Sequence, residues 1–596
     1  MTDLPDFPCR GLRRRSRIPA MKRAAGWRRW SAVVALAGAV LGAAGAEEAP
    51  LAGSPFGELL AADATQPEAP HRALRLEIGA EALLARVHLI RAARRSVDIQ
   101  TFIWSNDECG RMLLWELLEA ARRGVRVRIV ADQMFSETDP EVIAFVATAH
   151  PNLEVRHYRP AFRRIDPALW RQALAALLSF RATNQRMHNK VMIVDGAVLL
   201  TGGRNIENAY YDHALEYNYR DRDVLATGPA VAEAQRSFEE YWNFRHAIPS
   251  RALKDVAAEI ERGRFRRYDR REDWEFGPSF AMIDREAGEA ATVRARFVAP
   301  LAVVRSARFV SDEAGKARGW LKRSAPRGTM ELRRALEQGR ADILVQTPYL
   351  VLSPAARDLI AELRRREPGL RIRISSNSFA STDNLMAYSG NYRLRNLYIE
   401  QLGLEVHEFK PRPAVLPALF PDWAAQDRLA AARVAAGEQK RPMYFSLHAK
   451  SLVVDDAVAF IGSYNLDPRS ENLNTEAGLL IEDAAFAQGL RAEIERDLRA
   501  ENSWVIARRA LPLGLDTVNG LVGRLAGLSP IDVWPIRNTT SFELRPGASE
   551  VAPSHPDFYR HYREAGSFPG AEGWMSQEEI VTRLYKAIGG PLTPIL

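Results

Sequence analysis

The stretch that decides the fold is HAKSLVVD, residues 448–455, followed by IGSYN at 461–465 and by NTE at 474–476. Counted from His448, Lys stands at +2, Asp at +7, Asn at +17 and Glu at +28. The apolar run before the Asp predicts a buried strand, in which residues i and i+2 share a face. The stretch therefore predicts a strand that carries a histidine and a lysine into one site.

The same frame occurs once before, as HNKVMIVD at 188–195 and GGRN at 202–205. The offsets from His188 are repeated there by Lys190, Asp195, Asn205 and Glu216. Five matched polar identities indicate a repeat and not chance. We interpret the chain as two homologous halves that each supply half of one site.

The expected secondary structure repeats as well. In the first half, expected strands alternate with expected helices over 96–104, 110–123, 125–132, 140–150 and 153–158. The second half repeats this order over 342–347, 354–366, 370–374 and 404–409. A β-α-β-α-β order predicts an α/β layered domain in each half.

A chain of 596 residues is too long for one small domain. The predicted division is a signal peptide or anchor over 1–46, a linker over 47–72, a first lobe over 73–245, a connecting segment over 246–328, a second lobe over 329–504 and a tail over 505–596. The connecting segment, an insertion at 412–442 and the tail lie outside the repeat. The sequence assigns no role to the insertion or to the tail.

The N-terminus has the pattern of an export signal. Basic residues at 22–30 precede an apolar run from Ser31 to Ala46, which ends in Ala-Gly-Ala. The run is short for a membrane span. We expect a cleaved signal peptide, with an uncleaved anchor as the alternative and Met21 as a candidate start. The expected location is the bacterial cell envelope, in the periplasm or on the periplasmic side of the inner membrane.

Charge and cysteine content limit the partners. The net charge is +8, and the first 46 residues account for +7 of it, so the remainder is almost neutral. A nucleic-acid binder normally carries a basic face, so we expect no nucleic acid. Two cysteines, Cys9 and Cys109, form no disulfide framework and no metal-ligand spacing. We therefore expect no metal and no cofactor.

The repeated residues suit chemistry at a phosphorus centre. A neutral imidazole can bond covalently to phosphorus while a lysine ammonium neutralises the phosphate oxygens. The Asn at +17 can donate to the same oxygens, and the Glu at +28 can accept the other ring proton of the histidine. One histidine would form a phosphohistidine and the other would move the proton. The Asp at +7 follows the strand directly and is expected to support the motif.

These motifs resemble the phospholipase D superfamily, whose signature is HxKxxxxD with a later GSxN. Only the second copy has the full GSxN, because the first copy has Gly203 at the position that corresponds to Ser463. The resemblance covers roughly 80–245 and 330–500 and implies two homologous lobes, each a mixed sheet flanked by helices, related by a pseudo-twofold axis. It implies His188 as nucleophile and His448 as general acid, an assignment that the similarity of the halves leaves open. The implied catalytic set is His188, Lys190, Asp195, His448, Lys450 and Asp455. The implied supporting set is Asn205, Asn465, Ser463, Glu216 and Glu476.

A narrower resemblance is to bacterial cardiolipin synthases of the C type. It rests on RMHNK at 186–190, STDN at 381–384, FKP at 409–411, SYNLDPRS at 463–470 and LNTE at 473–476. The implied reaction transfers a phosphatidyl group between phospholipids at a membrane surface. Phosphatidylglycerol is the implied substrate, with phosphatidylethanolamine as a second candidate.

Three other functions are weighed against this one. A hydrolase of the same fold would use the same residues, with water as the acceptor. A nuclease or other phosphodiesterase conflicts with the neutral charge of the body. A non-enzymatic scaffold conflicts with the intact motif residues in both halves. The sequence leaves transferase against hydrolase, the lipid donor and acceptor, and the oligomeric state open.

Overall fold

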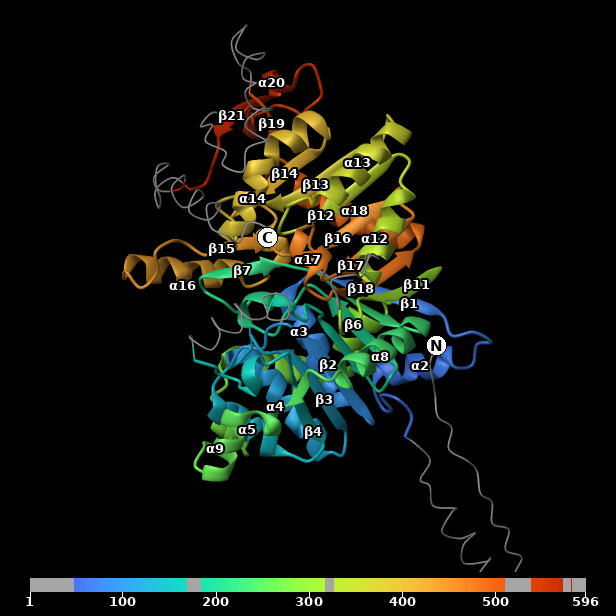
Figure 1. Cartoon of the computed structure of the whole chain (residues 1–596), viewed down its shortest axis with the longest axis vertical. Helices are drawn as coiled ribbons and strands as arrows, with labels where there is room; N and C mark the ends of the chain where they lie inside the picture. Colours follow the sequence, from blue (N-terminus) through green and yellow to red (C-terminus); the bar gives the residue numbers. More distant parts are fainter. Residues whose placement is uncertain are drawn as a thin grey trace, which may run out of the picture. The chain divides into compact units, whose positions relative to one another are not determined.

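The computed structural model describes residues 48–134, 136–168, 184–316, 326–509, 538–571 and 580. The predicted leader at 1–46 lies outside these residues, as does most of the predicted tail. Within Ala49–Leu596, two large sheets carry helices on their faces (Figure 1). This arrangement confirms the predicted α/β class with two lobes built on mixed sheets.

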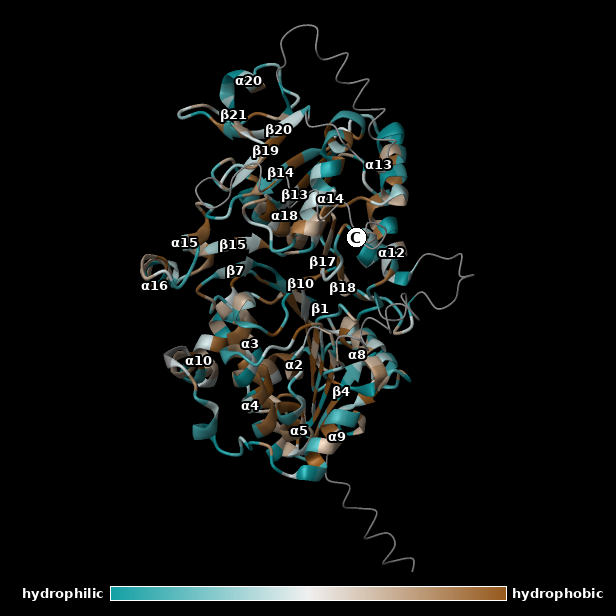
Figure 2. Cartoon of the chain, turned by 60° about the vertical axis from the view of Figure 1, so that its left-hand side comes forward, coloured by the Kyte–Doolittle hydropathy of each residue, from teal (hydrophilic) through white to brown (hydrophobic). Residues whose placement is uncertain are grey.

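The first lobe is a nine-stranded sheet in the order β10-β1-β8-β6-β5-β2-β3-β4-β9. Its strands are β1 (His71–Leu76), β2 (Ser96–Thr101), β3 (Arg126–Asp132), β4 (Leu153–Tyr158), β5 (Val191–Val194), β6 (Val198–Gly202), β8 (Asp223–Thr227), β9 (Ala247–Pro249) and β10 (Ala302–Val304). Strands β2, β3 and β4 are parallel, and the other pairs are antiparallel. The main helices are α3 (Gly79–Ala92), α4 (Glu108–Arg122), α5 (Pro140–Ala149) and α8 (Pro229–Trp242). Figure 2 shows apolar residues concentrated on this sheet and on the adjoining helices.

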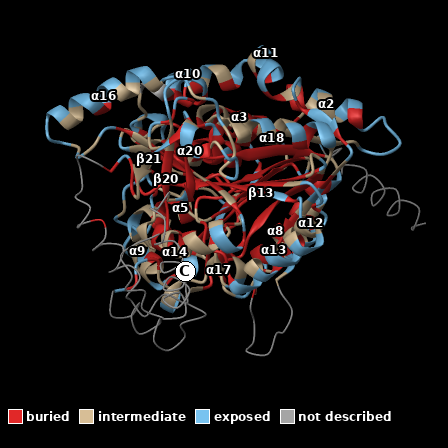
Figure 3. Ribbon diagram, turned by 90° about the horizontal axis from the view of Figure 1, so that it is seen from above, coloured by how far each residue is buried: buried red, intermediate tan, exposed pale blue. Residues whose placement is uncertain are grey.

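The second lobe is a ten-stranded sheet in the order β11-β18-β17-β16-β12-β13-β14-β19-β20-β21. Its strands are β11 (Ser306–Ser311), β12 (Asp342–Gln346), β13 (Arg371–Asn377), β14 (Glu405–Phe409), β16 (Ser451–Val454), β17 (Val458–Gly462), β18 (Ala477–Glu482), β19 (Ser503–Arg508), β20 (Thr539–Leu544) and β21 (Tyr562–Gly566). The main helices are α12 (Arg327–Glu337), α13 (Pro354–Arg366), α14 (Leu385–Asn396) and α18 (Ala484–Leu498). Figure 3 shows buried strands beneath helices whose outer faces are exposed.

The two HxK motifs lie at equivalent positions in the two sheets. Strand β5 lies between β6 and β2, and β16 lies between β17 and β12. All four residues of each motif strand are buried. Each motif strand is held on both sides by a neighbouring strand, which fixes its direction. The histidine and lysine that precede each strand therefore lie at corresponding strand ends in the two sheets.

The lobes extend further along the chain than the repeat indicates. The expected linker at 47–72 contains helix α2 (Pro55–Asp63), and its Phe56 is fully buried in the core of the first lobe. Ser54 caps this helix and Pro55 occupies its first turn, which favours a helix start. Segment 246–328 contributes β10 to one sheet and β11 to the other, and residues after 505 contribute β20 and β21. These segments have no counterpart in the repeat, and they add strands at the edges of the two sheets.

The lobes join through short backbone pairings. Strand β7 (Tyr217–Arg220) of the first half runs parallel to β15 (Tyr444–Leu447) of the second (Figure 1). The insertion at 412–442 forms α15 (Leu416–Leu419) and α16 (Trp423–Ala435) and packs Leu416 and Phe420 against β15. No helix among the described residues combines the length and hydropathy that a membrane crossing requires.

Candidate active site

Backbone bonds across the lobe junction hold both motif histidines. The His188 amide donates to the Thr475 carbonyl at 3.0 Å, and the His448 amide donates to the Arg220 carbonyl at 2.8 Å. Thr475 and Arg220 each immediately precede an acidic residue of the opposite lobe. The junction therefore brings each histidine beside an acid that its own lobe does not supply.

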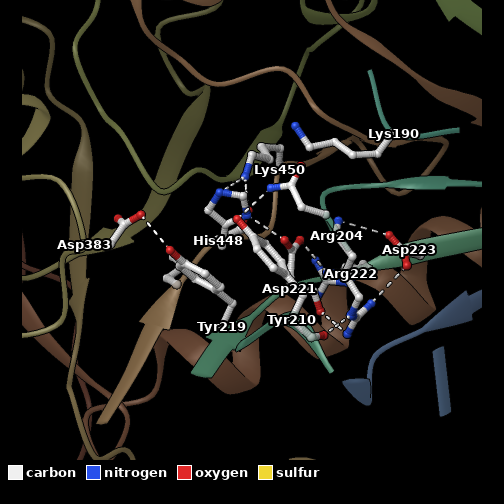
Figure 4. Close-up of polar contacts among 12 residues, drawn as sticks. Lys190, Arg204, Tyr210, Tyr219, Asp221, Arg222, Asp223, Asp383, His448 and Lys450 are labelled. Carbon is white, nitrogen blue, oxygen red and sulfur yellow. Dashed lines mark hydrogen bonds and ion pairs between the residues drawn. The ribbon is translucent and has the colours of Figure 1, made fainter. Parts of the chain in front are cut away.

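The two histidine–carboxylate pairs cross between the lobes. His188 Nδ1 lies 2.8 Å from Glu476 Oε2, and His448 Nδ1 lies 2.6 Å from Asp221 Oδ2 (Figure 4 shows the second pair). All four side chains are buried. A carboxylate beside Nδ1 favours the proton on that nitrogen and leaves Nε2 for chemistry. Among the described residues, none forms a hydrogen bond to Nε2 of His188.

The prediction that Glu216 supports the site is wrong. Glu216 is exposed, and Asp221 takes the position that corresponds to Glu476. In the sheets, Gly202 pairs with Asp223 and Gly462 pairs with Gly478, so the residues two places upstream are Asp221 and Glu476. The first half has 16 residues from Asn205 to its acid, whereas the second has 11 from Asn465.

The five extra residues of the first half explain the error. The short turn Asn208–Tyr210 lies within this longer connection. A glutamate therefore falls at +28 in both halves although only Glu476 belongs to the site. One signal in the sequence could have identified Asp221. It is an acidic residue two places before β8, the strand that pairs with β6 at Gly202.

The predictions for Asp195 and Asp455 as catalytic residues are also wrong, whereas their expected supporting role fits the structure. Each lies at the far end of a motif strand from its histidine. The Asp195 carboxylate accepts hydrogen bonds from the backbone amides of four residues, which are Leu51, Arg94, Arg95 and Ser96. Asp455 accepts those of Arg340, Ala341 and Asp342. Both have positive φ (53° and 48°), which an Asp adopts more readily than most residues.

The two motif lysines place positive charge beside the histidines. Lys190 Nζ donates to the His188 carbonyl at 2.8 Å, and Lys450 Nζ lies 2.7 Å from His448 Nδ1 and 3.0 Å from Nε2. Burial, and then the charge of Lys450, lower the pKa of Lys190 well below its usual value. Burial lowers the pKa of Lys450 to about 8. A bound anion would stabilise both ammonium groups.

His188 is held in the neutral form. Burial lowers the pKa of His188 to about 4, against the opposing charge of Glu476. Burial and the charge of Lys450 lower the pKa of His448. Burial would raise the pKa of Asp221, but the charges of His448 and Lys450 outweigh it and keep the carboxylate ionised. A neutral imidazole with an oriented Nδ1–H is the form that a nitrogen nucleophile requires.

Ser463 and Asn205 lie at the site, where they form hydrogen bonds to other residues of the chain. Ser463 Oγ donates to Glu476 Oε2 at 2.5 Å. In the first lobe a Cβ on Gly203 would lie 2.0 Å from Asp221 Oδ1, so a serine does not fit there. Asn205 donates to the Tyr210 hydroxyl at 2.7 Å and accepts from the Ile103 amide. The buried Asn465 Oδ1 has no partner in the described chain.

Aromatic residues line the two half-sites differently. The Phe102 ring lies 4.8 Å from the ring of His188. The Tyr219 ring lies 4.7 Å from that of His448, and its hydroxyl donates to Asp383 (Figure 4). Asp383 belongs to the STDN motif, so the sequence resemblance included it without assigning it a place. No group of three or more His, Cys, Asp and Glu side chains in the described ranges could hold a metal.

Comparison with known proteins adds independent findings. The protein family described as "Cardiolipin synthase, PLD-like domain" matches residues 87–242 and 332–498. Cardiolipin synthase C of Escherichia coli K12 is 32% identical over 417 residues, which span 69% of this chain and 82% of the relative. An uncharacterized protein of Helicobacter pylori 26695 is 29% identical over 76% of this chain and 84% of its own length. The solved phosphatidylserine synthase of Haemophilus influenzae Rd KW20 aligns with a TM-score of 0.47 and 17% identity over 73% of this chain and 87% of that one.

Proposed function

We propose a specific reaction for this chain, which belongs to the cardiolipin synthase family with phospholipase D-like domains and is a phospholipid phosphatidyltransferase. The reaction joins the phosphatidyl group of one phospholipid to the headgroup hydroxyl of phosphatidylglycerol, which yields cardiolipin. The observation that carries this proposal is the crossed pair of histidines, each held by a carboxylate of the other lobe and each with a buried lysine beside it.

The first step transfers the phosphatidyl group to the protein. Nε2 of His188 attacks phosphorus and forms a P–N bond while Glu476 holds the Nδ1 proton. The P–O bond to the leaving headgroup breaks, and His448 in its protonated form gives the oxygen its proton. Asp221 stabilises the imidazolium of His448.

The second step restores the enzyme. The acceptor hydroxyl gives its proton to His448 and attacks phosphorus as the P–N bond breaks. Lys190 and Lys450 stabilise the charge on the non-bridging oxygens in both steps. With phosphatidylglycerol as donor the released alcohol is glycerol, and with phosphatidylethanolamine it is ethanolamine. Water in place of the acceptor would yield phosphatidic acid.

The proposed setting is a membrane surface of the bacterial cell envelope. The support is the basic and apolar leader at 22–46, which has the pattern of an export signal. The lipid substrates also require contact with a bilayer. Fractionation of cells expressing the full chain would test this location: we expect the protein in the envelope fraction, and recovery in the cytoplasm would overturn it.

A product assay tests the reaction. Purified full-length protein receives labelled phosphatidylglycerol, alone and with phosphatidylethanolamine, and the lipids are separated. We expect labelled cardiolipin, and none from the His188→Ala variant. Phosphatidic acid as the sole product would replace the proposal with a hydrolase, and neither product from folded protein would overturn it.

A further inference from the structure

The second lobe contains an apolar cavity beside the active site. It encloses about 1180 Å³, counting the part open to solvent, between helices α12 and α13 and the underlying sheet. Its wall includes Leu336 of α12, Ile360 of α13 and Leu452 and Phe460 of the sheet. Figure 1 shows the two helices over the second-lobe strands.

An active-site residue is part of the cavity wall. Lys450 lines the cavity together with Gln346, Thr347 and Ser451. Leu452 of the motif strand lies two residues after Lys450 and lines the same cavity. The ammonium of Lys450 contacts His448. The cavity wall therefore combines a cationic residue of the active site with apolar side chains.

The first lobe lacks such a space behind its lysine. There the cavity that Lys190 lines encloses only about 370 Å³ and includes Arg86 and Arg204 in its wall. Arg86 forms an ion pair with Asp223 at 2.8 Å. Arg204 donates hydrogen bonds to four backbone carbonyls of its own lobe. The residue that corresponds to Arg204 is Tyr464, whose hydroxyl lies 3.0 Å from Thr329 of α12. The hollow is thus a property of the second lobe and not of the shared fold.

The cavity leaves apolar side chains incompletely covered. Leu332, Leu336 and Ile360 are only partly buried although they pack on the core of the second lobe, and Met330 is 36% exposed. In the first lobe, 11 of the 14 residues of α3 are buried. Apolar surface in contact with water is unfavourable by about 25 cal/mol per Å², so an apolar occupant would be stabilised there.

We propose that this cavity holds an acyl chain of the phospholipid whose phosphate lies beside Lys450. The inference rests on the proposed function and names a binding site for that substrate. An anionic phosphate attached to an apolar chain matches a cavity that is lined by a lysine and by many aliphatic side chains. Because the space that Lys190 lines in the first lobe encloses only about 370 Å³, we assign the selection of acyl-chain length to the second lobe.

Cavity-filling variants test the site. We would measure kcat/KM for dihexanoyl and dioleoyl phosphatidylglycerol with the wild type and with Ala356→Trp and Leu336→Trp, both of which place an indole in the cavity. We expect about a tenfold loss with the dioleoyl lipid and less than about a twofold change with the dihexanoyl lipid. The matched control is Ala361→Trp, because Ala361 is exposed on α13 and should leave both values unchanged.

A second readout does not depend on turnover. Phosphatidylglycerol with a diazirine at the end of one acyl chain is bound to the wild type and irradiated, and the labelled peptides are identified by mass spectrometry. We expect label in 327–337 or 354–366, and less label in the Ala356→Trp variant. Label confined to other segments would overturn the inference.

The outcomes separate the two proposals. Equal losses for both lipids in the Trp variants, or no loss, would overturn the acyl site while lipid turnover by the wild type stands. Absence of any lipid turnover by folded wild type would overturn the proposed function, and the acyl site with it. If Ala356→Trp fails to fold, Leu336→Trp on the opposite helix provides the same comparison.

Discussion

The two half-sites share a frame but differ in several of the residues around it. Each lobe supplies a histidine and a lysine before a buried central strand. Beyond these, the first lobe offers Asp221 where the second offers Glu476, Gly203 where the second offers Ser463, and Arg204 where the second offers Tyr464. The repeat thus sets the geometry of the site, whereas the differences allow the two histidines to perform different steps.

The crossed pairing makes neither half-site complete. His188 depends on an acid of the second lobe, and His448 depends on an acid of the first. The structural elements that hold the lobes together, such as the parallel pair β7 and β15, therefore also align the acids with the histidines. Changes that disturb one lobe should act on the histidine of the other.

The largest expected effect comes from removing either histidine. His188→Ala and His448→Ala should each lower kcat for cardiolipin formation by about 10³-fold or more, because each removes one half of the same proton and phosphoryl transfer. The double variant should lose little more than either single variant. Steady-state rates with labelled lipid measure this effect. Near-wild-type turnover by either single variant would contradict the claim that the two histidines act in one reaction.

The next effect should come from the crossed acids. Asp221→Asn and Glu476→Gln should each lower kcat by about 10²-fold, since an amide no longer stabilises the charged or oriented imidazole. Glu216→Gln is the matched control, because Glu216 is exposed and lies outside the site. Its rate should stay within about twofold of the wild type. A loss at Glu216 equal to that at Asp221 would contradict the assignment.

The pH profile should reveal the lysine of the second half-site. Burial lowers the pKa of Lys450 to about 8, so its charge is present below that pH and lost above it. The rate should therefore fall about tenfold per pH unit above about 8. On the acid side, the pKa of His188 at about 4 implies that the nucleophile is protonated, and activity lost, only below that value. A rate that rises through pH 8 to 10 would contradict this role for Lys450.

The smallest effect on turnover should come from the motif aspartates. Asp195→Asn and Asp455→Asn should change kcat by less than about twofold, because neither side chain reaches the histidines. The free energy of unfolding should fall by about 1–3 kcal/mol, more for Asp195, which accepts more buried amides. Thermal unfolding and initial rates test this, and a large loss of kcat in a stable variant would return Asp195 to the catalytic set.

The repeat allowed the fold and the reactive pairs to be predicted. Alternating apolar residues and the matched HxK spacing fixed the central strands, the two lobes and the meeting of two histidines and two lysines. Glu476 was assigned as a supporting acid, but the acid of the first half was not, because a five-residue difference in one connection placed Glu216 at a misleading offset. Pairing across the lobes is a tertiary contact with no local pattern. Helix α2 was missed because its Ala-rich and Pro-containing sequence is compatible with a linker.

The most direct test of the divided labour between the lobes is to trap the covalent intermediate. Wild-type protein and phosphatidylglycerol labelled in its phosphate are mixed, quenched in base within one turnover and digested, and the modified histidine is located by mass spectrometry. We expect the label on His188, whose imidazole is neutral and oriented by Glu476, and none on His448. Label on His448, or no covalent intermediate under conditions of full turnover, would contradict it.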